Sequence, residues 1–435
     1  MKNKAISLTV AMVLSLSTFA TSFKTDRTWY LAGEAMKVNI TVEDALIAYA
    51  ELCDTYELAA GVVVSLKGGE GTGIVELPPD LHSGYYVLSV YTRNNANVSH
   101  QLVAVVNPLH KSEDDDIEWV KLADSESESF ATTVVSPNTF QLPPSTIPVD
   151  VRETEGHIIK ARIQNVYNGN TFKDNQICPS LSIVGKQIHY FEGKMVNDSR
   201  AVFYTYDIHG KQPLVLSAMS STGVSLPIEM ISPFATLLPK ELPHLVFHYK
   251  RSEVEARSLD MQRHQIAITP AKQEQQLFVK QSGGAERGVF VDDNAEDGVP
   301  LDYNETVFGT KPDLTYNLDE YRQFLTINEV LHEYVLCVRK IKNNGIPQLI
   351  VRKEQDFYNS SLPTLVLIDG MPVTDVERLL NYDARRIHYI NIYGGQFTFG
   401  NGVYNGILSF VTRSGRLTNY PTETNVQYLV YDFPE

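Results

Sequence analysis

Residue types that can bind a metal ion occur together in three short segments of the chain. His244 and His248 point to one side if their segment is a strand, and Asp114 to Asp116 form a run of carboxylates. Residues 292–298 (DDNAEDG) are rich in carboxylates, but Asp297 stands where a calcium loop needs its glycine, and no glutamate closes the loop. No third ligand accompanies the histidines. We therefore expect no metal site, and a calcium site stays open as the alternative for both acidic segments.

Asp369 follows directly on the apolar segment Thr364 to Ile368, at the end of a strand expected to be buried, where a carboxylate could be catalytic. The alternative is a turn cap, in which its carboxylate accepts hydrogen bonds from the backbone of Gly370 and Met371. The sequence contains no G-x-S-x-G, H-E-x-x-H or Walker motif. We therefore predict a protein that is not an enzyme.

Two further patterns also have non-catalytic explanations. GNGVYNG (residues 400–406) superficially matches a dinucleotide fingerprint, but its third glycine is misplaced and an apolar strand pattern follows where a helix is needed. Cys53, Cys178 and Cys337 are an odd number of widely spaced cysteines with no metal-knuckle spacing. We expect structural turns at the glycines, buried free thiols at the cysteines, and no cofactor.

The elements that position Asp369 follow one another closely. After the strand Thr364 to Ile368, Thr374 and Glu377 have the spacing of a capping box ahead of a short helix. An alternating strand over residues 387–392 leads to a loop, and the strand Ile407 to Thr412 closes the unit. The loop is expected to carry five glycines: Gly394, Gly395, Gly400, Gly402 and Gly406.

A second helix and a hairpin are predicted upstream. Thr326 and Glu329 form another capping box before an apolar helical face. Asn344-Gly345 separates two apolar segments and predicts a type I′ turn.

Taken together, the segments LVLIDGMPV, IHYINIYGG and YNGILSFVTRSG resemble the plug domain of TonB-dependent outer-membrane receptors, especially those of Bacteroidetes. The resemblance implies an α/β plug-like domain over residues 319–415, with Phe397 and Phe399 as possible partner contacts. Its partner would be an outer-membrane barrel or another envelope protein. No barrel follows in this sequence and no TonB box is recognised, so the receptor's pore-blocking role is not carried over whole. The plug-like motif comprises Ile368, Asp369, Gly370, Gly394, Gly395, Gly400, Gly402, Asn405 and Gly406.

The N-terminus predicts export. Lys2 and Lys4 precede an apolar run that ends at Ala20, which is typical of a signal peptide, here assigned to residues 1–22. No later segment has transmembrane length, so the expected location is the periplasm or the periphery of the outer membrane. The formal net charge of −15 argues against nucleic acid as a partner.

With 435 residues, the chain is expected to hold several domains. Residues 23–107 show short alternating strands, and Tyr30, Gly84-Tyr85 and Tyr91 belong to a pattern that resembles the macroglobulin-type sandwich. An acidic, proline-rich linker is predicted over 108–150 and a second sandwich over 151–234. An irregular connector over 235–318 and a tail over 416–435 complete the division. The predicted fold is thus two all-β immunoglobulin- or macroglobulin-like sandwiches followed by the plug-like domain.

These observations favour a non-enzymatic exported envelope protein that acts by binding, in transport or in assembly with a barrel. One alternative is a surface adhesin or carbohydrate-binding protein that uses Tyr85, Tyr86 and Tyr91 as an aromatic platform, although such residues are more often core. A macroglobulin-like protease trap or a hydrolase with paired carboxylates is less favoured, since no thioester motif or carboxylate pair is recognised.

Overall fold

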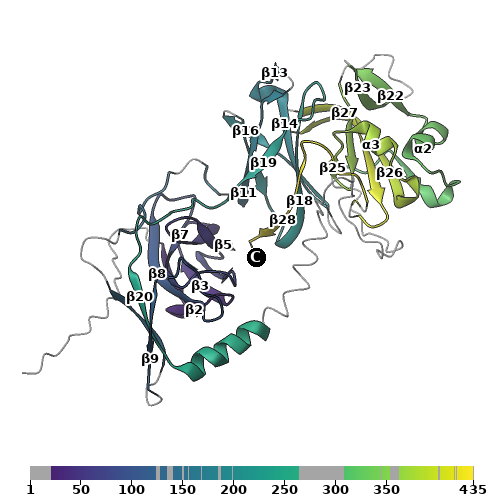
Figure 1. Cartoon of the computed structure of the whole chain (residues 1–435). Helices are drawn as coiled ribbons and strands as arrows, with labels where there is room; N and C mark the ends of the chain where they lie inside the picture. The colour runs from purple at the N-terminus through teal and green to yellow at the C-terminus, as the bar shows by residue number, and fades with distance from the viewer. Residues whose placement is uncertain are drawn as a thin grey trace, which may run out of the picture. The chain divides into compact units, whose positions relative to one another are not determined.

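A computed structural model describes residues 21–123, 128–134, 141–148, 151–154, 156–167, 169–184, 188–197, 199–263, 308–343, 345–352, 362–399, 402–415, 417 and 419–434. The described chain is mostly β-strand and forms two compact units (Figure 1). The first contains Met1–Thr154 and Phe234–His264, and the second contains Glu155–Pro233 and Gln265–Glu435. No described helix is both long and apolar enough to cross a membrane.

The first unit is built on a β-sandwich whose two sheets enclose one apolar core. In β3 the apolar Met36, Val38 and Ile40 are buried and the polar Lys37 and Asn39 are exposed, which confirms the predicted alternation. One sheet has the order β1-β3-β6 and the other β2-β8-β7-β4-β5. The strands are β1 (Ser22–Thr25), β2 (Trp29–Leu31), β3 (Ala35–Thr41), β4 (Ile47–Cys53), β5 (Leu58–Ser65), β6 (Glu70–Glu76), β7 (Gly84–Tyr91) and β8 (Val98–Val106).

A third sheet of the first unit corrects the predicted linker over 108–150. It has the order β10-β20-β9, with β9 (Ile117–Lys121), β10 (Phe130–Val134) and β20 (His244–Tyr249). A helix over residues 251–263 follows β20. The predicted connector over 235–318 is therefore also wrong in its first part. Composition could not reveal this sheet, because β9 and β10 find their partner more than a hundred residues later.

Residues 234–263 belong to the first unit although the second sandwich precedes them in the chain, and we call them the returning segment. Buried polar groups hold this segment on the first sandwich. The Glu51 carboxylate on β4 is fully buried and accepts hydrogen bonds from the amides of Thr236 (3.1 Å) and Leu237 (2.6 Å). Arg257 of the helix bonds Glu34, and its guanidinium carbon lies 3.5 Å from the ring centroid of Trp29. These contacts make the segment part of the unit's core rather than a surface connector.

The second unit contains another sandwich, with sheets β16-β17-β11-β19 and β15-β14-β18-β28. The predicted tail over 416–435 is wrong, because it contains the edge strand β28, whose Tyr431 and Phe433 enter the sandwich core. The elements are β11 (His157–Ile163), a β12–β13 pair (Val166–Tyr167, Asn170–Thr171), η1 (Asp174–Gln176), β14 (Ile177–Ile183), β15 (His189–Glu192), β16 (Lys194–Asn197), β17 (Arg200–Thr205), β18 (Gly210–Ser220), β19 (Ile228–Ile231) and β28 (Gln427–Phe433).

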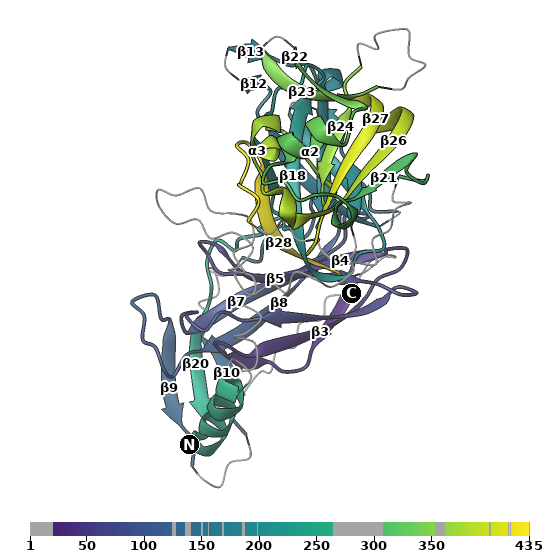
Figure 2. The same cartoon turned by 90° about the vertical axis from the view of Figure 1, so that its right-hand side faces the viewer.

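A mixed five-stranded sheet with short helices completes the second unit, and we call it the C-terminal module. Its strand order is β21-β26-β27-β24-β25, and Figure 2 shows β24, β27, β26 and β21 side by side. A two-stranded hairpin, β22–β23, stands beside it. The elements are β21 (Leu314–Asn317), η2 (Leu318–Glu320), α2 (Ile327–Glu333), β22 (Val338–Asn343), β23 (Ile346–Val351), β24 (Leu365–Ile368), β25 (Met371–Pro372), α3 (Val376–Leu380), η3 (Ala384–Arg386), β26 (Ile387–Phe399) and β27 (Gly402–Thr412).

Local signals in this module are mostly confirmed. The capping box of Thr326 and Glu329 starts α2, and Asn343 pairs with Ile346 at the closed end of the predicted hairpin. The predicted box at Thr374 is wrong: Asp375 caps α3, while Thr374 donates to the buried Glu423. Only the side-chain partners, and not the spacing, distinguish these two cases.

The glycine-rich loop predicted after residue 392 is largely a β-hairpin. β26 runs to Phe399 and β27 starts at Gly402, with a register shift between Tyr393 and Gln396. Gly395 lies in that shift with φ +118°, so the glycines mark a bulge inside a strand rather than a loop.

Candidate binding cleft

Asp369 is a structural residue. Its fully buried carboxylate accepts hydrogen bonds from the amide and hydroxyl of Thr412 (2.7 and 2.6 Å) and from the amide of Leu417 (2.9 Å). Burial raises its pKa to about 6, although these hydrogen bonds act in the opposite direction. The carboxylate thus binds β27 and the segment after it, and the predicted bonds to Gly370 and Met371 are not the ones formed.

Gly370 joins the module to the second sandwich. Its φ is +82°, and its carbonyl accepts a hydrogen bond from the Ser182 hydroxyl at 2.8 Å. A Cβ added here would lie 2.1 Å from Cγ2 of Ile188, so these two segments of the chain approach too closely for a side chain at position 370. Ile368 beside it is fully buried in a core that the module shares with Val184 and Val215 of the sandwich.

The remaining residues of the plug-like motif do not converge on one site. Gly394 and Gly395 lie in β26, and Gly402, Asn405 and Gly406 lie in β27. Gly400 lies outside the described residues, as does the side chain of Phe399. Phe397 is half-buried and packs on the cluster around Leu365, Tyr393 and Ile407, and its role as a partner contact stays a prediction.

The two histidines considered as metal ligands make other contacts in the structure. His244 bonds Asp116, and His248 stacks on Phe130 at 4.5 Å between ring centroids. In the described chain no three His, Cys, Asp or Glu side chains converge as metal ligands, and residues 292–298 lie outside it.

The structure also shows how far the three tyrosines of the proposed aromatic platform and the three cysteines are buried. Tyr85, Tyr86 and Tyr91 are at most 7% exposed, which removes the surface platform proposed for them. All three cysteines are free; Cys53 is buried as expected, while Cys178 and Cys337 are half-buried.

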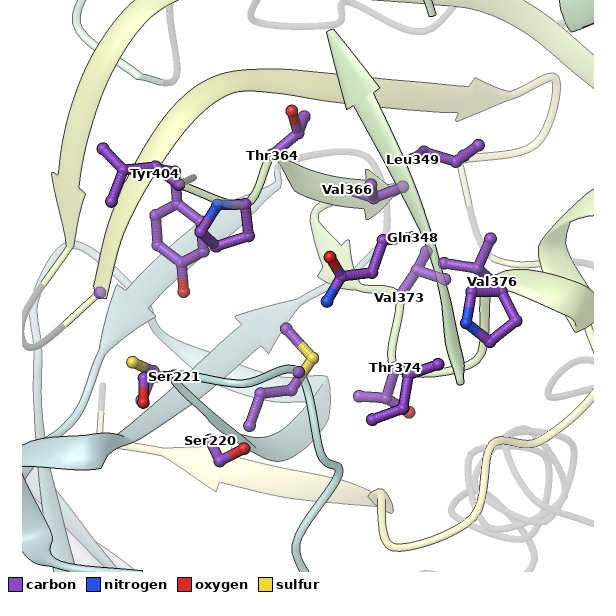
Figure 3. Close-up of a pocket in the computed structure, with 18 of the residues that line it drawn as sticks. Ser220, Ser221, Gln348, Leu349, Thr364, Val366, Val373, Thr374, Val376 and Tyr404 are labelled. Carbon is purple, nitrogen blue, oxygen red and sulfur yellow. The ribbon is translucent and has the colours of Figure 1, made fainter. Parts of the chain in front are cut away.

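A cleft of about 310 Å³ opens inside the second unit, where the end of the sandwich meets the C-terminal module. One wall is formed by Met219 and Ser220 of β18 together with Ser221 and Gly223 of the turn that follows, and residues 346–349 of β23 form another. Val366 of β24, Val373 after β25 and Val376 at the start of α3 also line it (Figure 3). This volume is at the lower end of the range for small-ligand pockets.

The titratable groups of the cleft are held neutral. Cys178 of β14 and Tyr404 of β27 share a hydrogen bond, and burial raises the pKa of each. Gly402 makes room for the Tyr404 ring, because a Cβ at Gly402 would lie 2.5 Å from it. None of the described residues that line the cleft carries a full charge. The cleft therefore offers neutral donors and acceptors on an apolar surface.

Gln348 bridges the two walls. Its amide nitrogen would lie 2.7 Å from a Cβ added to Gly223, so the side chain reaches the backbone of the turn (Figure 3). Ser221, in the same turn, is exposed at the rim.

Sequence reasoning missed this cleft. Its lining comes from β14, β18, β23, β24, α3 and β27, and neutral residue types at such separations form no motif. The Asn-Gly turn was the one available signal, since it fixed the hairpin that supplies β23.

Comparisons with known proteins add no family. No family model matches the chain, and no curated protein does. The domain titled "Biofilm associated protein - BSP domain" matches with 10% identity and a TM-score of 0.17, covering 53% of this chain and 30% of that one. An Escherichia coli alpha-2-macroglobulin activated by porcine elastase matches with 10% identity and a TM-score of 0.18, covering 48% and 20%. A tandem repeat from a large adhesion protein matches with 8% identity and a TM-score of 0.15, covering 49% and 50%. Likeness this low supports no argument about fold or function.

Proposed function

We propose that this chain is a non-enzymatic, exported binding protein of the bacterial envelope, and that its second unit binds a partner in the cleft. The observation that carries this proposal is the uncharged cleft, whose thiol and phenol stay protonated because burial raises the pKa of both. Neutral groups of this kind recognise a ligand by hydrogen bonds and apolar contact without activating a nucleophile.

The C-terminal module is further proposed to be plug-like, of the kind found in Bacteroidetes, and to work with an outer-membrane barrel or another envelope protein. In support, the module has a helix, a hairpin, a strand and a short helix in the order expected from the resemblance, and the strands β26 and β27 follow. The first sandwich is proposed to be macroglobulin-like, and the location to be the periplasm or the periphery of the outer membrane. An adhesin role would need a surface other than the buried tyrosines.

Capture of partners from outer-membrane extract tests the proposal. Ser221→Trp places a large side chain at the rim from an exposed position, so the fold should persist while the cleft is blocked. Thr222→Trp is the matched control, because Thr222 is exposed in the same turn but does not line the cleft.

The expected result is that wild type and Thr222→Trp retain one common partner and that Ser221→Trp loses it. Recovery of a barrel protein would support the plug-like reading. Equal capture by all three proteins, with unchanged thermal unfolding, would place binding elsewhere and overturn the proposal.

A further inference from the structure

The edge of β23 that faces away from β22 belongs to residues that line the cleft. Asn343 and Ile346 flank the hairpin turn and form a hydrogen-bonded pair. The backbone N–H and C=O groups of Ile346, Gln348 and Ile350 therefore point toward β22, and those of the residues between them point away from it. Two observations fix this parity. The Val351 amide donates to the Thr364 hydroxyl at 3.0 Å, and position 347 is a proline, which has no N–H to donate. The N–H and C=O of Leu349 therefore point away from β22.

No described strand pairs with this edge, because β22 and β23 form a sheet of two strands only. Yet residues 346–349 line the cleft, and Leu349 is only 2% exposed. A peptide group facing an enclosed space favours a hydrogen-bonding partner, since burying it without one is costly.

We propose that the cleft binds an extended, uncharged peptide segment that adds to β23 as a third strand. This inference rests on the proposed binding function and names its ligand. Strand addition supplies main-chain hydrogen bonds along a free edge, while neighbouring pockets select alternate side chains. Met219, Val373 and Val376 offer apolar contact to such side chains.

Charge and length restrict the ligand further. A charged side chain would be desolvated in the cleft with no opposite charge among the lining residues that the structure describes. Thr364 already bonds Val351, so the free edge spans residues 346–349 and accommodates a short segment.

The test uses the full chain and a fluorescent, end-blocked hexapeptide of alternating valine and threonine, followed by anisotropy. Two further peptides carry N-methyl groups on alternate amides, one set in each register. Strand addition predicts that one methylated peptide binds at least tenfold more weakly and that the other stays close to the parent. Replacing a central threonine by glutamate should also weaken binding at least tenfold.

Ser221→Trp should abolish peptide binding, and Thr222→Trp should leave it unchanged. Equal binding by both methylated peptides would show that the main chain is not recognised and would overturn strand addition. Absence of peptide binding, while Ser221→Trp still loses the captured partner, would overturn the peptide ligand and leave the proposed function standing. Unchanged capture by Ser221→Trp would overturn the proposed function itself.

Discussion

Two buried carboxylates anchor the segment that follows β27. Asp369 accepts the amide of Leu417, and Glu423 accepts the amide of Thr374 and the hydroxyl of Tyr420. Burial raises the pKa of both. At the residue scale, therefore, the second unit keeps acids in its interior for their hydrogen bonds, at a cost in charge burial.

Asp369 should give the second unit a pH-dependent stability. Because its folded pKa of about 6 exceeds the unfolded value of 3.8, the folded state binds the proton more tightly. The stabilising contribution is complete below pH 4 and is lost as the pH rises to about 6, by roughly 3 kcal/mol. Asn tolerates the positive φ of +46° at this position, so Asp369→Asn removes the titration with little backbone strain.

Chemical denaturation between pH 4 and pH 7 measures this effect. Asp369→Asn should be less stable than wild type at pH 4.5, since the side-chain NH2 group takes the place of a carboxyl oxygen that accepts a hydrogen bond. The free energy of unfolding of this variant should also change less with pH. An identical pH profile in the two proteins would contradict the assignment.

Gly370→Ala should separate close packing from backbone strain when it is compared with Gly345→Ala. Both glycines have φ +82°, but only Gly370 has a neighbour within contact distance of an added Cβ. Strain alone should cost about 1 kcal/mol at Gly345. Gly370→Ala should cost clearly more, because Ile188 or the turn must move; similar unfolding midpoints would contradict this.

At the element scale, the sequence predicted those structures whose partners lie nearby. The capping box at Thr326, the Asn-Gly hairpin and the alternation of β3 depend on contacts within a few residues. β9, β10 and β28 were missed because the strands with which they pair are distant in sequence. The cleft was missed for the same reason, since elements from both ends of the second unit line it.

The strand β28 should be essential to the second sandwich. Its Tyr431 hydroxyl lies 2.6 Å from Nε2 of His157, and Phe433 is 2% exposed in the core. Truncation after Thr424 would expose the edge of β18 and remove both aromatics, at roughly 3 kcal/mol or more for each. Loss of cooperative unfolding in the truncated chain is the expected result, and Tyr431→Phe, which keeps the ring, should remain folded.

At the scale of the whole molecule, the chain leaves the first unit, builds the second sandwich and returns. Glu51 should control that return, because its carboxylate accepts two amides of the returning segment. Glu51→Gln replaces an acceptor oxygen by a donor, so hydrogen exchange over residues 234–263 should accelerate while residues 387–412 keep their protection. Glu43→Gln, at an exposed position, is the control. Faster exchange in both regions would contradict independent units.

Because the first unit contains segments from before and after the second sandwich, its parts are synthesised at different times. Arg257 meets Trp29 across 228 residues of sequence. At roughly 5–20 residues per second of synthesis, Arg257 is added on the order of 10–45 s after Trp29. During that interval β7 and β8 are made but the side of Trp29 and Tyr85 that β20 covers stays open. Late assembly therefore leaves the nascent chain with an exposed apolar surface, which a chaperone in the same compartment would have to protect until β20 emerges.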